Sequence, residues 1–354
     1  MTIPTEPVGS VPRSAELQAG MQAHADGSLS AEALNDLFDA AVSETVARFE
    51  ATGSPVVTDG EQTKSSFATY PLEGLATLAP NGVKIPFEDG HVRQLPVITA
   101  GPFQYQNLAG SYVKRTRKFT DRPVKQAVIS ASAMGLLYPA AGLDGYSPEQ
   151  FHDDLIDQAV ADIRSCLDAG ADSVQVDFTE GRLALKLDPS GGLLQDFIDL
   201  NNEVFARFSD EELQRIGVHT CPGGDHDSTH SADIDYVELI PKLLTLSAGR
   251  FFMQMASEAD PGRSLAVVAQ HLQPHQRVYV GVIDVCNEVV ESAQTVCDRV
   301  LAAAEHIPVG QLGTTDDCGY SPFSDDIATS RDTAFAKISA RVQGTQMAAD
   351  KLGI

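Results

Sequence analysis

Short apolar, β-branched runs alternate with longer segments of helical periodicity over most of this chain. Such an alternation needs crossover connections, which place the strands in parallel in one sheet. The chain has 354 residues, 43% of them hydrophobic, enough to fill a large core. The strand-like runs are 55–61, 95–101, 126–132, 173–178, 216–221, 250–256, 277–284 and 311–318. The helix-like segments include 30–52, 147–169, 192–208, 235–246, 261–271, 292–306 and 330–352.

The number of strand-like runs favours a closed α/β barrel of the (β/α)8 type over an open sheet. When 8–10 is added there is one run too many, and we expect 95–101 to lie outside the barrel. No repeat or linker marks a second domain. We therefore predict a single barrel domain over residues 1–354, with an N-terminal irregular and helical extension.

The charge balance is strongly acidic, with 25 Lys and Arg against 49 Asp and Glu and a net charge of −24. Nucleic acid and anionic membrane would be repelled and are not expected as partners. No run approaches the ~20 apolar residues that span a bilayer, and residues 1–10 lack a signal-peptide pattern. With five cysteines, an odd number, these features predict a cytoplasmic protein with reduced thiols. The one basic run, 114–118, leaves open a homo-oligomer with intersubunit ion pairs.

Chemically capable residues stand where several strands should end. They are Asp59 and Glu61, Asp177, His219 and Cys221, Asp284, and Asp316 to Cys318. In a (β/α)8 barrel the carboxyl ends of the strands form the active-site face. This pattern predicts an enzyme.

Three of these residues suit a metal ion. His219 and Cys221 are two positions apart, so both side chains point to the same side of an extended strand. Barrel closure can bring Cys318, at the end of the last run, close to them. Zinc favours thiolate and imidazole in a tetrahedral set, and a catalytic site keeps one position open. Buried cysteines also serve as small hydrophobic residues, so the spacing alone leaves metal binding open.

Short motifs in a fixed order narrow the choice. They are Gly-Ser-x-Pro at 9–12, Asp-Gly-Glu at 59–61, Val-Gln-Val-Asp at 174–177, Glu-Gly at 180–181, His-Thr-Cys at 219–221, Gly-Val-Ile-Asp at 281–284 and Asp-Cys-Gly at 317–319. In this order they resemble the C-terminal catalytic barrel of cobalamin-independent methionine synthase and its short relatives, which include the epoxyalkane:coenzyme M transferases. The resemblance covers nearly the whole chain.

The resemblance implies one Zn²⁺ that binds a thiol substrate as its thiolate, with His219, Cys221 and Cys318 as ligands. It also implies that Ser10, Glu61 and Asp177 hold the amino and carboxylate ends of homocysteine. The chemistry is consistent, because a free thiol with a pKa of ~8.5 is only slightly ionised at pH 7 and zinc deprotonates it.

The chain departs from the family pattern chiefly on the folate side. It has no Trp to stack a pterin, and the synthases' Asp-x-His reads Asp284-Val285-Cys286 here. The family's Asp-Glu pair reads Asp177-Phe178, so one carboxylate is lost. The fourth zinc ligand, a Glu in the family, is matched by Gln254 or replaced by Glu258.

The loop after Cys221 is also unlike that of the synthases. Its His226 and His230 are candidates to protonate an alkoxide formed when a thiolate opens an epoxide, and they join Asp284 as candidate catalytic residues. A polar surface loop is the alternative interpretation of these histidines.

We therefore expect a zinc-dependent thiol S-alkyltransferase, a methionine synthase-like enzyme that transfers a methyl or alkyl group to a homocysteine-type thiol. Epoxide opening by a zinc-bound thiolate, as in the coenzyme M transferases, is the alternative within the superfamily. A non-catalytic zinc- or thiol-binding barrel is the alternative from another class. The expected partners are a small-molecule thiol and an alkyl donor.

Overall fold

Six parallel strands form the central sheet of the computed structural model, which describes residues 2–354. In chain order they are β5 (Lys125–Ile129), β6 (Ser173–Asp177), β7 (Ile216–Thr220), β10 (Arg250–Met253), β11 (Arg277–Gly281) and β12 (Leu312–Thr315). The register places His219 between Asp177 of β6 and Phe252 of β10. Because all six strands run in the same direction, their carboxyl ends meet on one face.

Two N-terminal extended segments complete the ring at the edges of this sheet. Thr5 pairs in parallel with β12, and Val57 pairs in parallel with the residue that precedes β5. The two segments also contact each other, since the Val11 N–H donates to the Gly60 carbonyl oxygen at 3.1 Å. Eight extended segments thus form a (β/α)8-type barrel, as the alternation of strand and helix predicted.

The run 95–101 lies outside the barrel, as expected. It belongs to an insertion between the second and third barrel segments, which contains η1 (Tyr70–Leu72), β1 (Leu78–Ala79), β2 (Lys84–Pro86), β3 (Val92–Gln94) and β4 (Val97–Ile98). β1 pairs antiparallel with β4, and β2 with β3. We call residues 84–94, the β2–β3 hairpin, the mouth hairpin, because its side chains line the cavity described below.

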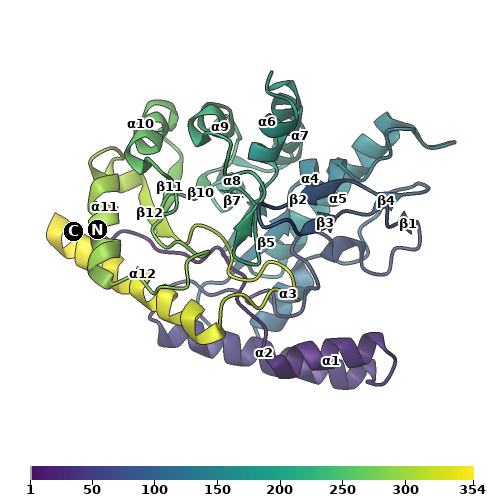
Figure 1. Ribbon diagram of the computed structural model, residues 1–354, viewed down its shortest axis with the longest axis horizontal. Helices are drawn as coiled ribbons and strands as arrows, with labels where there is room; N and C mark the ends of the chain where they lie inside the picture. The colour runs from purple at the N-terminus through teal and green to yellow at the C-terminus, as the bar shows by residue number, and fades with distance from the viewer. Residues whose placement is uncertain (1) are drawn as a thin grey trace.

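Helices surround the barrel on its outside (Figure 1). The predicted segments are confirmed as α2 (Ala31–Ala51), α5 (Pro148–Asp168), α7 (Gly192–Phe205), α9 (Tyr236–Leu243), α10 (Pro261–His271), α11 (Ala293–Ala304) and α12 (Arg331–Leu352). Ser30 caps α2, because its side chain accepts the Ala33 N–H. Helices that periodicity did not predict are α1 (Ala15–Ala25), α3 (Gly110–Thr116), α4 (Ala131–Gly135), α6 (Gly181–Leu187) and α8 (Asp210–Leu213). α2 is the predicted helix of the N-terminal extension, and it lies with α1 along one side of the barrel (Figure 1).

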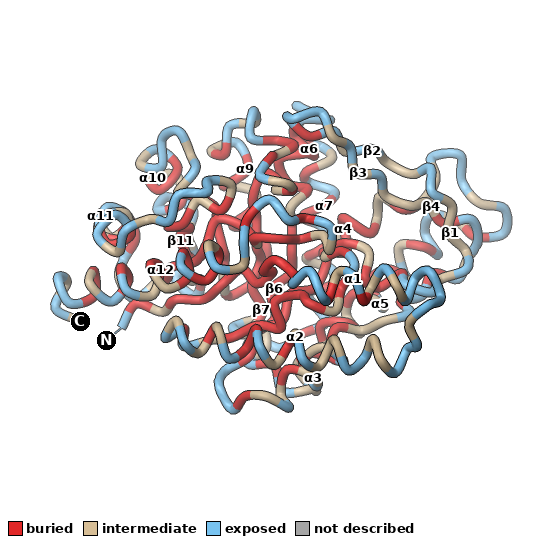
Figure 2. The backbone as a smooth tube through the Cα atoms, turned by 60° about the horizontal axis from the view of Figure 1, so that its bottom comes forward, coloured by how far each residue is buried: buried red, intermediate tan, exposed pale blue. Residues whose placement is uncertain are grey.

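Buried residues concentrate in the barrel strands and on the helix faces that cover them (Figure 2). β5, β6, β7 and β12 are buried at every residue. Continuous burial is typical of parallel strands that are covered on both faces. The buried set includes Lys125 and Gln175, so the barrel interior is partly polar.

Two local expectations need correction or refinement. Four predicted runs extend three residues past their strands: β5 ends at Ile129, β10 at Met253, β11 at Gly281 and β12 at Thr315. After β5, Ser130 caps α4 by accepting the Ala133 N–H. In the basic run 114–118, Lys118 lies 3.0 Å from Asp39 of the same chain, so its charge is partly neutralised.

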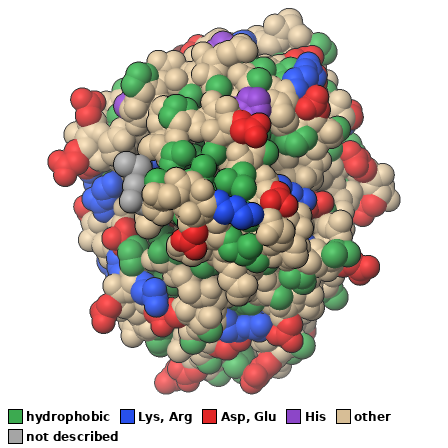
Figure 3. All heavy atoms as spheres, turned by 90° about the vertical axis from the view of Figure 1, so that its left-hand side faces the viewer, with side chains coloured by type: hydrophobic (Ala, Val, Ile, Leu, Met, Phe, Trp, Pro, Cys, Tyr) green, Lys and Arg blue, Asp and Glu red, His purple; other side chains and the backbone are tan. Residues whose placement is uncertain are grey.

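The surface and the helices add two observations. Acidic and basic side chains are interspersed on the face seen in Figure 3. Within residues 2–354, no helix has both the length and the apolar character needed to cross a membrane.

Candidate active site

Three candidate metal ligands meet at the carboxyl end of the barrel. His219 lies on β7, Cys221 follows that strand directly, and Cys318 follows β12. The two Sγ atoms are 3.3 Å apart. One donor atom from each of the three residues lies within 4.8 Å of the others. The structure therefore brings together the residues that strand-end placement singled out, and we call them the metal group.

The ring of His219 is oriented as a metal ligand requires. Its Nδ1 lies 3.2 Å from the carbonyl oxygen of Phe252 on the neighbouring strand β10. Its Nε2 is buried and has no hydrogen-bond partner. A proton on Nδ1, donated to that carbonyl, leaves the Nε2 lone pair available. An unpartnered imidazole nitrogen beside two thiols fits Zn²⁺, which takes nitrogen and sulfur ligands.

The two thiols of the metal group are not equivalent. A hydrogen bond from the Cys318 thiol, with His219 nearby, lowers the pKa of Cys221 well below its ordinary value. The same hydrogen bond raises the pKa of Cys318. The Gly223 N–H also points at Cys221 Sγ, at 3.4 Å. Cys221 is therefore the first of the pair to become the thiolate that a metal needs.

The two candidates for a fourth ligand have different surroundings. Glu258 forms an ion pair with the buried Arg182. Gln254 directly follows β10, and its Nε2 donates to Ser257 Oγ at 2.7 Å, whereas its Oε1 is buried without a partner. Gln254 also lines a small cavity of about 150 Å³ together with both cysteines. The geometry favours the Gln254 amide oxygen.

Asp317 holds the loop after β10 against the metal group. Its Oδ1 accepts the N–H groups of Met255 and Ala256, both at 2.9 Å. Its Oδ2 accepts the N–H of Ser257 at 2.8 Å and the hydroxyl of the same residue at 2.7 Å. Burial raises the pKa of Asp317 to about 6. Since Asp317 precedes Cys318, these four bonds fix a cysteine of the metal group relative to the neighbouring loop.

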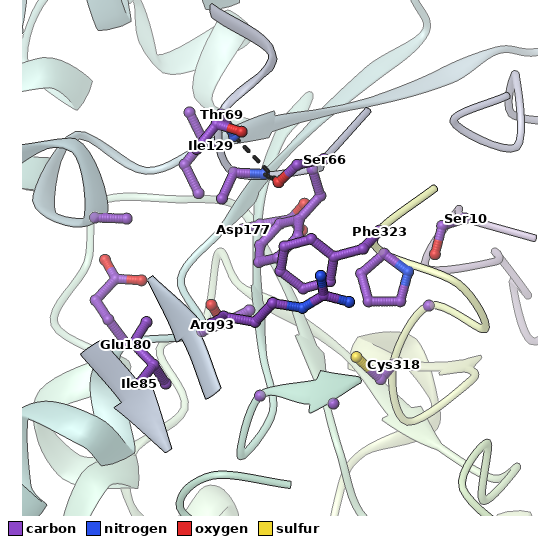
Figure 4. Close-up of a pocket in the computed structure, with 18 of the residues that line it drawn as sticks. Ser10, Ser66, Thr69, Ile85, Arg93, Ile129, Asp177, Glu180, Cys318 and Phe323 are labelled. Carbon is purple, nitrogen blue, oxygen red and sulfur yellow. Dashed lines mark hydrogen bonds between the residues drawn. The ribbon is translucent and has the colours of Figure 1, made fainter. Parts of the chain in front are cut away.

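The three candidate substrate-binding residues face one cavity of about 400 Å³. Ser10, Glu61 and Asp177 line it together with His219 and Cys318. Figure 4 shows Ser10 and Cys318 on one side of this cavity and Glu180 and Ile85 on the other. The residues predicted for substrate and for metal therefore share a single space.

Glu61 is held in an unusual conformation. Its φ is +55°, in the left-handed region that non-glycine residues rarely adopt. Arg13 Nη2 donates to the Glu61 carbonyl oxygen at 2.6 Å, and the Glu61 N–H donates to Asp59 Oδ1 at 2.9 Å. The buried Lys64 Nζ pairs with Glu61 Oε1 at 2.9 Å. Such backbone strain is kept where surrounding contacts enforce it, and it clusters at functional sites.

Asp177 and Ser10 are fixed by neighbours from other segments. Gln175 Nε2 donates to Asp177 Oδ1 at 2.7 Å, and burial raises the pKa of Asp177 to about 6. Ser10 Oγ accepts the Ser321 N–H at 3.2 Å. A Cβ on Gly319 would lie 2.1 Å from Ser10 Oγ, so glycine beside Cys318 permits this close approach.

Arg93 lines the cavity and contacts the loops on its other side. It lies on the mouth hairpin, and its Nε donates to Asp225 Oδ2 at 2.5 Å. Asp225 belongs to β8 (Gly224–Asp225), which pairs with β9 (Ser228–Thr229). Its Nη2 donates to Asp325 Oδ1 at 2.8 Å, and its guanidinium lies 4.1 Å from the Phe323 ring centroid (Figure 4). One side chain thus joins the hairpin to the loops that follow both cysteines of the metal group.

Glu180 is a site residue whose role the sequence did not reveal. It is buried, and the hydroxyls of Ser130 and Ser132 both donate to its Oε1, whereas Oε2 has no partner. Burial raises the pKa of Glu180 to about 7. It lines the 400 Å³ cavity. Its place in the Glu-Gly motif was the signal in the sequence. The motif did not show that Glu180 accepts from Ser130 and Ser132 and lines the cavity.

The candidate catalytic residues occupy three different places. His230 lines the large cavity, its Nδ1 is 2.7 Å from Ser231 Oγ, and burial lowers its pKa to about 4, so it is neutral at pH 7. His226 instead faces Arg93, with Nε2 3.2 Å from Nη2. Asp284 lines the 150 Å³ cavity with Cys286. The structure does not bring the three together.

The protein is thus a (β/α)8 barrel with a His-Cys-Cys group beside a cavity at the carboxyl ends of its strands. This is a candidate metal centre on the face that carries the active site in this fold. The chain belongs to the family of cobalamin-independent synthase catalytic domains, whose model matches residues 3–331.

Curated relatives agree with this family. The 5-methyltetrahydropteroyltriglutamate–homocysteine methyltransferase of Vibrio vulnificus is 21% identical over 319 residues. That of Nitratidesulfovibrio vulgaris is 24% identical over 328 residues. Each match covers 90% of this chain but only 39% of the relative, so the chain spans about two fifths of their length.

The solved structures support the fold. A B12-independent methionine synthase from a Shewanella species, in complex with selenomethionine, superposes with a TM-score of 0.79 at 20% identity, covering 99% of both chains. A putative B12-independent methionine synthase from Listeria monocytogenes gives a TM-score of 0.70 at 19% identity, covering 98% of both chains.

Proposed function

We propose that this chain is a zinc-dependent thiol S-methyltransferase of the methionine synthase type, with homocysteine or a closely similar thiol as acceptor. The observation that carries the proposal is the shared cavity, in which His219 and Cys318 of the metal group stand beside Ser10, Glu61 and Asp177. The methyltransferase names of the relatives support the same reaction class.

The residues of the metal group suit the metal that the family implies. His219 Nε2 and the Sγ atoms of Cys221 and Cys318 would hold Zn²⁺, with Gln254 Oε1 as the fourth protein donor. Bound zinc would supply a thiolate at neutral pH from a thiol whose free pKa is ~8.5. Because Gln254 is a neutral amide, this ligand set carries one negative charge less than it would with a carboxylate.

The cavity offers different chemistry to the two substrates. The Glu61 and Asp177 carboxylates suit the ammonium group of an amino-acid thiol. Ile85, Phe87 and Phe323 line the same cavity and suit a larger, less polar donor. A volume of about 400 Å³ lies in the range of small-molecule sites, and burial under the mouth hairpin would exclude water from the reacting groups.

Metal content and turnover test this proposal together. We expect about one zinc per chain in the wild type, much less in Cys221→Ser, and methionine formation from homocysteine and a methyl-folate only with zinc-loaded protein. A second arm replaces the substrates by coenzyme M and an epoxide. Wild type without zinc after metal-replete purification would contradict the proposal. Thiol consumption only in the second arm would replace methyl transfer by epoxide opening, and zinc without turnover in either arm would indicate a binding protein.

A further inference from the structure

A lysine lies inside the barrel, beneath the candidate substrate site. Lys125, the first residue of β5, is fully buried, and its Nζ donates to Gln175 Oε1 at 2.9 Å. Gln175 on β6 in turn donates from Nε2 to Asp177 Oδ1 at 2.7 Å. We call these three side chains the Lys125–Gln175–Asp177 chain. It runs from the barrel interior to a carboxylate that lines the cavity.

Besides Gln175, the buried amine of Lys125 contacts an aromatic ring and a buried carboxylate, with which it forms a long ion pair. Its Nζ lies 3.8 Å from the ring centroid of Phe252 and 3.9 Å from Glu6 Oε2, beyond hydrogen-bond distance. The amide oxygen of Gln175 is the hydrogen-bond acceptor that the described residues offer it. Burial of an amine is costly unless it is hydrogen-bonded, and the bond to Gln175 supplies that hydrogen bond.

The direction of the hydrogen bonds follows from the chemistry of the groups. An amide has one end that only accepts and one end that only donates. The Lys125 N–H requires the oxygen of the Gln175 amide, which turns the amide nitrogen toward Asp177. An ionised carboxylate only accepts, so this polarity suits Asp177 and leaves its Oδ2 for another donor. Without Lys125, the Gln175 oxygen would be buried without a donor and the amide would be free to turn away.

We propose that Lys125 is a positioning residue for the thiol substrate, which acts through Gln175 to hold the Asp177 carboxylate where it binds the substrate's ammonium group. This inference rests on the proposed function, because it assumes an amino-acid thiol in the cavity. It adds a residue that does not line the cavity itself.

The test compares two thiols that differ only in the ammonium group. Equilibrium binding of L-homocysteine and of 4-mercaptobutyrate is measured on zinc-loaded wild type, Lys125→Met, Gln175→Met and the double variant. We expect Lys125→Met to weaken homocysteine binding about tenfold and to leave 4-mercaptobutyrate binding unchanged. The double variant should bind homocysteine no more weakly than Gln175→Met, because both substitutions break the same chain.

Arg341→Met is the matched control. Arg341 is another fully buried basic side chain, and it bonds to Asp316 and to the Glu6 carbonyl oxygen rather than to Gln175. We expect it to lower the melting temperature and to keep the wild-type preference for homocysteine.

Three outcomes would overturn the inference. If Lys125→Met weakens both thiols equally, or neither, the lysine is only a structural residue. If Lys125→Met does not fold, Gln175→Met decides the question alone, and an unchanged preference in that variant refutes the chain. If the wild type binds both thiols equally, the proposed acceptor is wrong and the inference falls with it. If instead the wild type prefers homocysteine and Lys125→Met keeps that preference, only the inference fails and the proposed acceptor stands.

Discussion

Cys221 Sγ and Cys318 Sγ lie 3.3 Å apart although 97 positions separate the two residues. Cys221 follows β7 and Cys318 follows β12, and two strands, β10 and β11, stand between these in the sheet. Their approach depends on the curvature that closes the sheet into a barrel, because the ends of non-adjacent strands converge only when the sheet is curved.

Removal of one thiol should remove the metal. We expect Cys318→Ser to lose most bound zinc, because a hydroxyl is a much poorer zinc ligand than a thiolate. Zinc per chain is measured after metal-replete purification and dialysis. Cys297→Ser is the matched control, since Cys297 is also buried but lies on α11. Full zinc in Cys318→Ser would exclude this cysteine as a ligand.

The fourth ligand can be identified by two substitutions. Gln254→Ala should raise the dissociation constant for zinc about tenfold or more, because it removes a donor atom. Glu258→Gln should keep zinc affinity and lower the free energy of unfolding by about 2 kcal/mol, because it weakens the pair with buried Arg182. Competition with a chromophoric chelator and denaturant unfolding measure the two effects. The reverse pattern would make Glu258 the ligand.

The buried carboxyl of Glu180 should make stability depend on pH. Burial raises its pKa from 4.5 to about 7. Between these values the unfolded chain has released the proton and the folded chain still holds it. The unfolded state therefore binds fewer protons, and the free energy of unfolding falls as pH rises. At a pH above both pKa values, the Glu180 carboxyl has lowered the free energy of unfolding by about 3 kcal/mol relative to low pH.

Glu180→Gln should flatten this part of the pH profile, because the amide keeps the shape and does not titrate. Denaturant unfolding at pH 4.5, 5.5, 6.5 and 7.5 on the metal-free protein measures the slope. Glu305→Gln, at an exposed position, is the control and should leave the slope unchanged. An unchanged slope in Glu180→Gln would show that this carboxyl titrates normally.

The Arg93 contacts should control access to the cavity. Arg93→Met removes the guanidinium that joins the mouth hairpin to Asp225 and Asp325. Because Asp225 is buried, loss of this pair should loosen the mouth hairpin on the β8–β9 segment, raising the KM for thiol several-fold and exposing residues 84–94 to proteases. Zinc content should stay unchanged. Arg93→Lys keeps the charge but cannot contact Asp225 and Asp325 at once as a guanidinium does. Its KM and protease resistance should lie between those of the wild type and Arg93→Met. Protease resistance equal to that of the wild type would rule out this role.

Local patterns predicted much of the fold. Seven helices and the parallel strands follow from hydrophobic periodicity, whereas α1 does not, and the position of 95–101 outside the barrel follows from the number of runs. The sequence missed the short strands of the mouth hairpin, since two- and three-residue strands carry too few side chains to show a period. It also extended the run 126–132 past Ile129, because Ser130 is a helix cap and not the end of a strand.

The sequence by itself determined the barrel and the candidate ligands, because strand ends and residue types are local properties of the chain. It could not choose between Gln254 and Glu258, since the choice depends on Arg182, which lies on α6. It could not assign Glu180 or Lys125 a place, because each depends on partners about 50 positions away. Only the tertiary structure decided these points, since closure of the barrel determines which distant side chains share the interior with the metal group.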